Sequence, residues 1–116
     1  MKIIAFSATP DQILIRTKTV TRRASERWMT LKPGQILRAV RKSQGLKKGE
    51  HVETLAMIRV TSVSRIPVSR ISAKEIAAEG FPGMKIPSFL KLLRRLSPEL
   101  RKPGALVTRI EFSYLD

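Results

Sequence analysis

Five segments of the chain have strand patterns: a short apolar run, a long β-branched segment and three segments in which residues of different polarity alternate. These segments span residues 2–6, 18–23, 36–42, 54–68 and 105–115. In the fourth segment the apolar positions change parity between Val60 and Val63, which indicates a bulge within the strand. Pro33 and Gly34 precede the third segment, so we expect a tight turn to lead into it.

Helical patterns fall between these segments. A short helix is predicted over residues 9–16, where Pro10 occupies the first helical position. Ser72 and Glu75 form a capping-box pattern that begins a helix ending near Gly80. A third helix is predicted over residues 88–96, whose apolar residues recur at helical spacing. The sequence therefore predicts one α+β domain over residues 1–116, with four to six strands in a small curled sheet or barrel.

Composition excludes several classes of chemistry. The chain has 116 residues, no cysteine and one histidine, His51, so disulfides, thiolate catalysis and cysteine- or histidine-based metal sites are not expected. No apolar run approaches the roughly 18 residues that a membrane span requires. The first residues have too short an apolar region for a signal peptide. We expect a soluble cytoplasmic protein with no membrane partner, no metal and no other cofactor.

Of all features of the composition, positive charge says most about the binding partner. The net charge is +14. Residues 1–48 carry 12 basic and two acidic residues, whereas residues 49–116 carry 11 basic and seven acidic residues. A small domain with this excess repels itself unless a polyanion neutralises it, so nucleic acid is the first partner to consider.

The segment "TKTVTRR", residues 17–23, combines strand alternation with unusual polarity. Spacing alone favours an edge strand that Lys and Arg protect from pairing with other chains. The alternative is catalysis, in which Lys18 and Thr21 act together as a Lys-x-x-Thr pair. The nearby cations Arg16, Arg22 and Arg23 favour a lowered pKa at Lys18, which a lysine needs to act as a base.

Other candidates surround this segment. Trp28 is able to stack on a base, although core packing is an equally good interpretation. The loop of residues 41–50 contains Arg41, Lys42, Lys47 and Lys48, which are suited to phosphate contacts. Glu75 and Glu79 are one helical turn apart. We expect Glu75 to cap its helix, which leaves Glu79 as the carboxylate with a functional role.

The order "TKTVTRR", Trp28, "LKPGQILRAV" resembles the ASCH superfamily, whose fold is similar to the PUA-like β-barrel. The family signature is Gly-x-Lys-x-x-Thr-x-Arg followed by a Lys-x-Gly turn. Lys18, Thr21 and Arg23 match the first motif, and Lys32 and Gly34 match the turn. Arg16 stands where the family has its glycine. The resemblance implies a small barrel of about five or six strands with two or three short helices.

The resemblance also implies two functions. ASCH domains are thought to bind RNA or nucleotides in a cleft beside the barrel, which implies a basic cleft around Lys18–Arg23 that binds nucleic acid, RNA more than DNA, or a nucleotide. The expected contacts are Arg16, Lys18, Arg22, Arg23, Trp28, Arg41, Lys42, Lys47 and Lys48. Alternatively, small members remove the acetyl group of N(4)-acetylcytidine, or cut RNA, and the catalytic positions then correspond to Lys18, Thr21 and Glu79. The sequence leaves the oligomeric state open.

Overall fold

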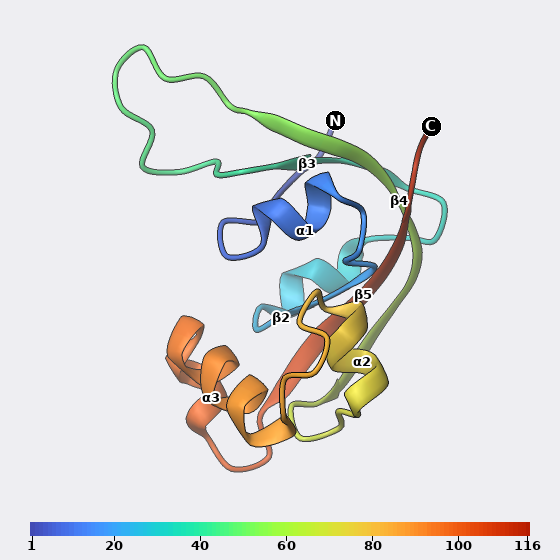
Figure 1. Ribbon diagram of the computed structural model, residues 1–116, viewed down its shortest axis with the longest axis vertical. Coiled ribbons are helices and arrows are strands. Elements are labelled where there is room, and N and C mark those ends of the chain that lie inside the picture. The colour runs from blue at the N-terminus through green and yellow to red at the C-terminus, as the bar shows by residue number, and fades with distance from the viewer.

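A five-stranded sheet forms the centre of the computed structural model, which describes all of residues 1–116 (Figure 1). Its strands are β1 (Ile3–Ala5), β2 (Val20–Arg23), β3 (Ile36–Val40), β4 (Thr54–Pro67) and β5 (Leu106–Tyr114). They lie in the order β1-β3-β4-β5-β2. The β1–β3 pair is parallel and the other pairs are antiparallel. Each of the five predicted segments forms a strand.

Three α-helices and two 3-10 helices cover the sheet. The α-helices are α1 (Pro10–Leu14), α2 (Ala73–Ala78) and α3 (Ile86–Leu96), and the 3-10 helices are η1 (Glu26–Thr30) and η2 (Pro98–Arg101). The predicted cap of α2 is present, because the Ser72 side chain accepts a hydrogen bond from the Glu75 backbone N–H at 3.2 Å. None of the helices has the length and apolar composition needed to cross a bilayer.

The sheet is open, so the α+β class is confirmed but a closed barrel is not. β1 and β2 are the two edge strands and do not pair with each other. A side chain connects them instead, since Arg23 Nη2 on β2 donates to the Ala5 carbonyl of β1 at 2.7 Å. We call this unpaired junction between β1 and β2 the seam.

The predicted bulge in β4 is confirmed. The pairing of β4 with β5 shifts register between Val60 and Ser62, which leaves Thr61 without a partner on β5. A bulge bends its strand and increases the local twist. β4 curves strongly along its length (Figure 1). This curvature brings the far end of the sheet toward α2 and α3.

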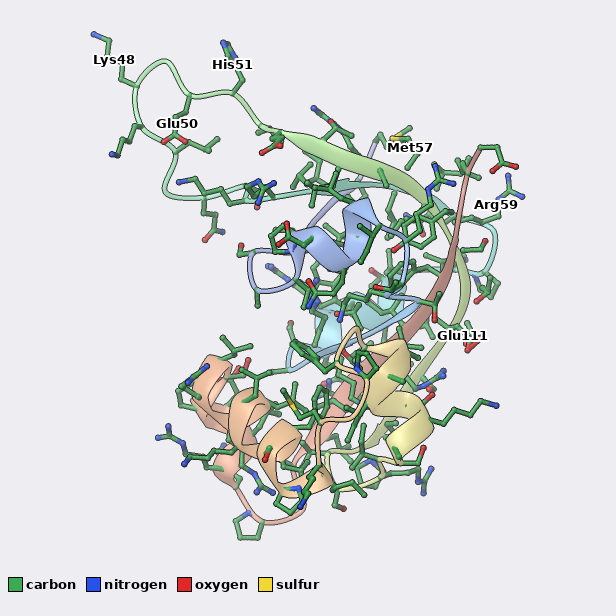
Figure 2. All side chains as sticks on the ribbon, viewed as in Figure 1. Lys48, Glu50, His51, Met57, Arg59 and Glu111 are labelled. Carbon is green, nitrogen blue, oxygen red and sulfur yellow. The ribbon has the colours of Figure 1, made fainter.

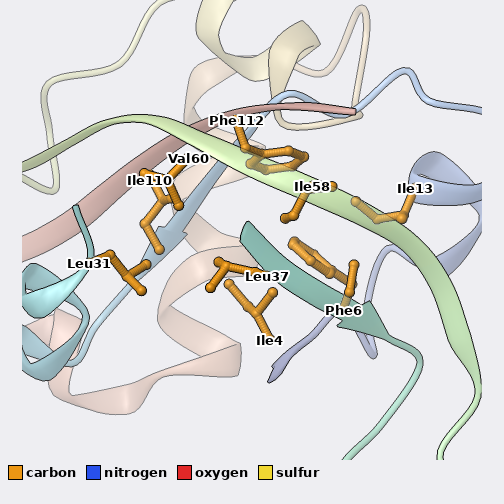
Figure 3. Close-up of a cluster of buried hydrophobic side chains, with 10 residues drawn as sticks. Ile4, Phe6, Ile13, Leu31, Leu37, Ile58, Val60, Ile110 and Phe112 are labelled. Atoms are coloured by element: carbon orange, nitrogen blue, oxygen red, sulfur yellow. The ribbon is translucent and has the colours of Figure 1, made fainter. Parts of the chain in front are cut away.

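Two hydrophobic clusters stabilise the fold. The larger packs α1 against the sheet (Figure 3), and its buried members are Ile4, Phe6, Ile13, Leu31, Leu37, Ala39, Ile58, Val60, Ile110 and Phe112. The smaller joins α2, α3 and η2 to the sheet, and its members are Val68, Ile76, Phe89, Leu93, Leu100 and Val107. The apolar stripe of α3 is only partly core. Phe89 and Leu93 are buried, whereas Leu92 is half-buried and Leu96 is 55% exposed.

The turn after α2 depends on Gly80. Its φ of +101° is a conformation that side chains other than glycine rarely adopt. A Cβ atom at this position would also lie 2.8 Å from Cγ of Gln12 in α1. The Gln12 side chain donates to the Gly80 carbonyl at 3.3 Å, so the two segments are in direct contact.

We expect Gly80→Ala to destabilise the protein more than Gly83→Ala. Gly83 also has a positive φ, +84°, but has open space where a Cβ would lie. Both variants should lose about 1–2 kcal/mol to backbone strain, and Gly80→Ala should lose about 1–3 kcal/mol more to overpacking against Gln12. Urea unfolding measures both values. Equal losses would show that the contact with Gln12 is unimportant.

Candidate functional site

A pocket of about 250 Å³ lies beside the seam, and we call it the main pocket. The end of β1 and the segment after it, residues 5–9, form one side of it. Its polar wall consists of Lys18, Thr21, Arg22, Arg23 and Glu79. Its apolar wall consists of Phe81, Phe89, Leu92, Leu93 and Leu96. The apolar stripe of α3 therefore lines this pocket with its core members, Phe89 and Leu93, as well as with the more exposed Leu92 and Leu96.

Lys18 is buried in the polar wall with 3% of its surface exposed. Its backbone is fixed because its N–H donates to the Gln12 carbonyl at 3.2 Å and its carbonyl accepts from the Tyr114 hydroxyl at 2.6 Å. Its Nζ donates to Glu79 Oε1 at 3.0 Å and to the Glu79 carbonyl at 2.7 Å. Burial lowers the pKa of Lys18, and the charge of Glu79 opposes that shift only in part. The amine is thus easier to deprotonate than a surface lysine.

The turn before Lys18 keeps a glycine-like shape although Arg16 replaces the glycine of the ASCH signature. Arg16 has a φ of +62°, in the left-handed region, at a cost of about 1–2 kcal/mol. Its guanidinium lies over the ring of Tyr114 at 5.4 Å and donates to the Leu115 carbonyl at 3.3 Å. The Arg16 side chain therefore lies outside the main pocket, although it was predicted to contact nucleic acid.

Glu79 ends α2 and is 3% exposed. Its second oxygen, Oε2, accepts from Arg22 Nη1 at 2.9 Å, so two cations share one carboxylate. Arg22 Nη2 continues the network to Glu75 Oε1 at 2.7 Å. Arg22 Nε is buried and has no acceptor within the protein. The two carboxylates, Glu79 and Glu75, compensate the buried charge of Arg22. An unpaired ion in the interior would cost several kcal/mol, on the order of 3–5.

The side chain of Glu75 does not cap its helix, which corrects the prediction for this residue. Its carboxylate binds Arg109 through two hydrogen bonds of 2.6 and 3.0 Å, in addition to Arg22. Arg109 in turn binds Glu111 at 3.1 Å. The bonds to Arg109 are the main reason that the pKa of Glu75 falls to about 2. Sequence reasoning missed Arg109 because it follows Glu75 by 34 positions.

Thr21 and Arg23 complete the polar wall. Arg23 Nε donates to Thr21 Oγ1 at 3.2 Å, and the Arg23 guanidinium lies over the Phe6 ring at 4.9 Å. Burial lowers the pKa of Arg23 to about 10, so the side chain stays charged at neutral pH. Lys18, Thr21 and Glu79, the three predicted catalytic residues, therefore line one pocket. Lys18 and Glu79 are in direct contact, whereas Thr21 is bonded to Arg23.

A second cavity of about 530 Å³ lies on the other side of Arg23, and we call it the Trp28 cavity. It shares Ala5, Ser7 and Arg23 with the main pocket. Its other charged or aromatic lining residues are Lys2, Arg27, Trp28 and Lys42. Trp28 and Lys42 were predicted from the sequence, whereas Lys2 and Arg27 were not. The position of Lys2 depends on the parallel pairing of β1 with β3, which the sequence pattern did not indicate, and Arg27 lies on η1 beside Trp28.

The remaining predicted cations line neither cavity. Arg41 pairs with Glu53 at 2.6 Å. Lys47 and Lys48 lie on the long loop between β3 and β4, which extends away from the helices, and Lys48 points outward from its tip (Figure 2). A nucleic-acid contact by these three residues stays a prediction. No group of histidine, aspartate and glutamate side chains in the structure could hold a metal ion.

Comparisons with solved structures identify the fold. The crystal structure of protein EF3133 from Enterococcus faecalis V583, of the DUF984 family, has a TM-score of 0.72 at 18% identity and covers 100% of this chain and 77% of that one. The hypothetical protein PH0355 has a TM-score of 0.68 at 21% identity, with coverage of 98% and 97%. The ASCH domain from Lactobacillus crispatus JV V101 has a TM-score of 0.62 at 16% identity, with coverage of 97% and 78%.

This chain has the ASCH-like fold. At these identities the likeness concerns the fold alone. No protein-family model matches the sequence, and no curated protein matches it. Within the ASCH-like fold, the main pocket lies where the predicted Lys-x-x-Thr motif meets the end of α2. Of the residues that carried the resemblance, Lys18, Thr21 and Arg23 line this pocket, whereas Trp28, Lys32 and Gly34 do not.

We expect the stability contribution of Glu75 to depend on pH. Because its pKa is about 2 in the folded protein and near 4.5 ordinarily, its ionised contacts stabilise fully above pH 4.5 and are lost as pH falls toward 2. Glu75→Gln should cost about 2 kcal/mol at pH 7, and this difference should shrink below pH 4.5. Unfolding in urea from pH 7 to pH 3 measures it.

The matched control is Glu53→Gln. Glu53 binds Arg41 on the exposed surface, where ion pairs contribute little. This variant should unfold almost as the parent does at every pH. A difference for Glu75→Gln that stays constant from pH 7 to pH 3 would contradict the assigned role of the carboxylate.

Proposed function

We propose that the main pocket binds one nucleoside or nucleotide unit of a nucleic acid, RNA in preference to DNA. The observation that carries the proposal is the pairing of an apolar wall from α3 with a cationic wall from β2. A nucleotide has a part that matches each wall, because the faces of its base are flat and apolar whereas its phosphate is anionic. The preference for RNA rests on the resemblance to ASCH domains.

The apolar wall suits a base. Phe81 and Phe89 pack against each other with their ring centroids 6.0 Å apart. Leu96 leaves 55% of its surface exposed at the wall of the pocket, which a bound base would cover. The volume of about 250 Å³ is near the lower end of small-molecule sites, which begin at about 300 Å³. The pocket therefore matches one base better than a longer stretch of chain.

The cationic wall suits a phosphate. Lys18, Arg22 and Arg23 line the pocket together with one carboxylate, that of Glu79. Glu79 is already bound by both Lys18 and Arg22, so its charge is neutralised within the protein. Arg23 has no carboxylate partner and remains available to an anion. Charge-assisted bonds from arginine to phosphate are among the stronger hydrogen bonds in proteins.

We expect Leu96→Asp to weaken the binding of cytidine monophosphate and of single-stranded RNA hexanucleotides by at least about tenfold, or 1.4 kcal/mol. The new carboxylate repels the phosphate and removes apolar surface from the wall. Leu14→Asp is the matched control, since Leu14 is also the last residue of its helix and is 50% exposed, but lines no pocket. Isothermal calorimetry measures both affinities.

Salt dependence distinguishes a phosphate contact from a purely apolar one. For the hexanucleotide, log K should fall with log salt at a slope of about −0.7 per neutralised phosphate. A matched DNA hexanucleotide should bind more weakly. Absence of saturable binding to the parent protein, or equal losses in the two aspartate variants, would contradict the proposal.

A second candidate function is hydrolysis of an acyl group on the bound base. The contact between Lys18 Nζ and Glu79 Oε1 at 3.0 Å inside the pocket favours it. A buried lysine with a lowered pKa is suited to accept a proton, and a carboxylate in contact with it is suited to pass that proton on. The Thr21 hydroxyl lies in the same wall and is a hydrogen-bond acceptor for Arg23, which leaves its proton free to be transferred.

In this mechanism the three residues act on an N(4)-acetylcytidine unit. Lys18 removes the proton of the Thr21 hydroxyl, whose oxygen attacks the carbonyl carbon of the acetyl group. Glu79 passes the proton from Lys18 to N4 as the bond between that carbon and N4 breaks. Water then hydrolyses the acetyl ester on Thr21 and releases acetate. The products are cytidine and acetate, and the protein returns to its starting state.

We expect Lys18→Arg and Glu79→Gln to lower the turnover of N(4)-acetylcytidine by at least about a hundredfold, the usual contribution of a general acid or base. Lys18→Arg retains a positive charge for Glu79 but has no basic amine. Chromatographic separation of cytidine from its acetylated form measures turnover, and circular dichroism checks that each variant is folded.

The control is Lys74→Arg, an exposed lysine on α2 that lines no pocket, which should turn over as the parent does. Single-stranded RNA serves as the second substrate, because some ASCH-type enzymes are expected to cut it. A parent protein that acts on neither substrate, or a Lys18→Arg variant as active as the parent, would rule out this function and leave the binding proposal intact.

A further inference from the structure

We infer that the Trp28 cavity holds the nucleotide next to the one in the main pocket, so that the ligand is an RNA strand rather than a free nucleoside. This inference rests on the proposed binding function. The two cavities together form one path that passes over Arg23. A strand that follows this path places one unit in each cavity and its linking phosphate at the guanidinium between them.

Arg23 is placed to receive the linking phosphate. It lines both cavities, and they also share the backbone segment that contains Ala5 and Ser7. Its Nε and Nη2 are held by Thr21 and the Ala5 carbonyl, whereas Nη1 makes no hydrogen bond within the protein. Two nitrogens of the guanidinium are thus fixed by the protein, and Nη1 is left to donate to a ligand. An arginine in this state is a preorganised phosphate contact.

The charge of the Trp28 cavity favours a polyanion. Lys2, Arg27 and Lys42 line it in addition to Arg23, and no aspartate or glutamate does. Lys42 has a carboxylate neighbour outside the lining, Glu50, at 3.7 Å. Both partners of that pair are more than a third exposed, and such pairs contribute little stability. A phosphate can therefore replace Glu50 at Lys42 at small cost.

Trp28 supplies a surface for a base. It is half-buried and packs in part against the larger core, which fixes the plane of its ring. Lys2, Arg23 and Arg27 lie over the ring at 5.2, 5.7 and 6.0 Å from its centroid, so cations for phosphate contacts are grouped around the aromatic ring. Aromatic side chains flanked by cations are typical of single-strand binding surfaces. An acidic peptide would use the cations but not the aromatic face.

The test compares ligands of one and two units. Cytidine 5′-monophosphate should bind in the main pocket, whereas the 5′-phosphorylated cytidine dinucleotide should bind at least about tenfold more tightly, the effect of one stacked base. Trp28 is the only tryptophan, so quenching of its fluorescence reports stacking directly. The dinucleotide should quench it strongly and the monophosphate weakly.

Variants test whether the tighter binding of the dinucleotide comes from the Trp28 cavity. In Trp28→Leu and Lys42→Gln, calorimetry should show the dinucleotide binding at the level of the monophosphate. Lys42 is exposed enough that its replacement leaves the fold intact, and Lys74→Gln is the control with the same charge lost. The control should keep the full gain.

The outcomes separate this inference from the proposal on which it rests. Equal affinity for the two ligands, with normal binding of the monophosphate, overturns the inference and leaves the proposed function standing. Absence of binding by both ligands overturns both. Quenching of Trp28 by a tetraglutamate peptide to the same extent as by the dinucleotide overturns the assignment to nucleic acid.

Discussion

The carboxylate of Glu79, shared in the interior by Lys18 and Arg22, is the interaction on which the site depends. It joins the end of α2 to the segment before β2 and to β2 itself, which are about 60 positions apart in the chain. Buried charges are tolerated only when they are paired, so each of the three side chains fixes the other two. The same contacts hold the helix against the sheet and set the electrostatics of the pocket. A substitution at any of the three residues therefore changes both the stability of the fold and the charge of the pocket wall.

The two cavities beside this network differ in character. The main pocket is small and has one apolar wall, whereas the Trp28 cavity is larger and is lined by cations without a carboxylate. Arg23 separates them and is held by Thr21 and the Ala5 carbonyl. In the function proposed above, the cavity on one side of Arg23 would select a base and the cavity on the other side would attract the phosphate chain. Under the proposed function, this division would let a strongly basic protein bind an extended anionic ligand next to a confined pocket.

Local patterns predicted most of the fold. Alternation, β-branched content and a short apolar run identified the five strands, a change of parity identified the bulge in β4, and the Ser72 cap marked the start of α2. These signals depend on neighbouring residues only. Spacing alone favoured a charged edge strand at residues 17–23, and β2 is indeed an edge strand, although Thr21 and Arg22 are buried. The site residues came from the resemblance to ASCH domains. Helical periodicity could not show that the apolar stripe of α3 lines a pocket, since the same stripe also supplies core residues.

The open seam has a consequence for association with other chains. Edge strands with free backbone groups recruit strands from neighbouring molecules and so promote aggregation. Here both edges are short, three residues in β1 and four in β2. The bond from Arg23 to Ala5 holds the two edges close to each other, so that neither offers the long, flat template that an incoming strand requires. The sheet thus limits the backbone that it offers for pairing without closing into a barrel.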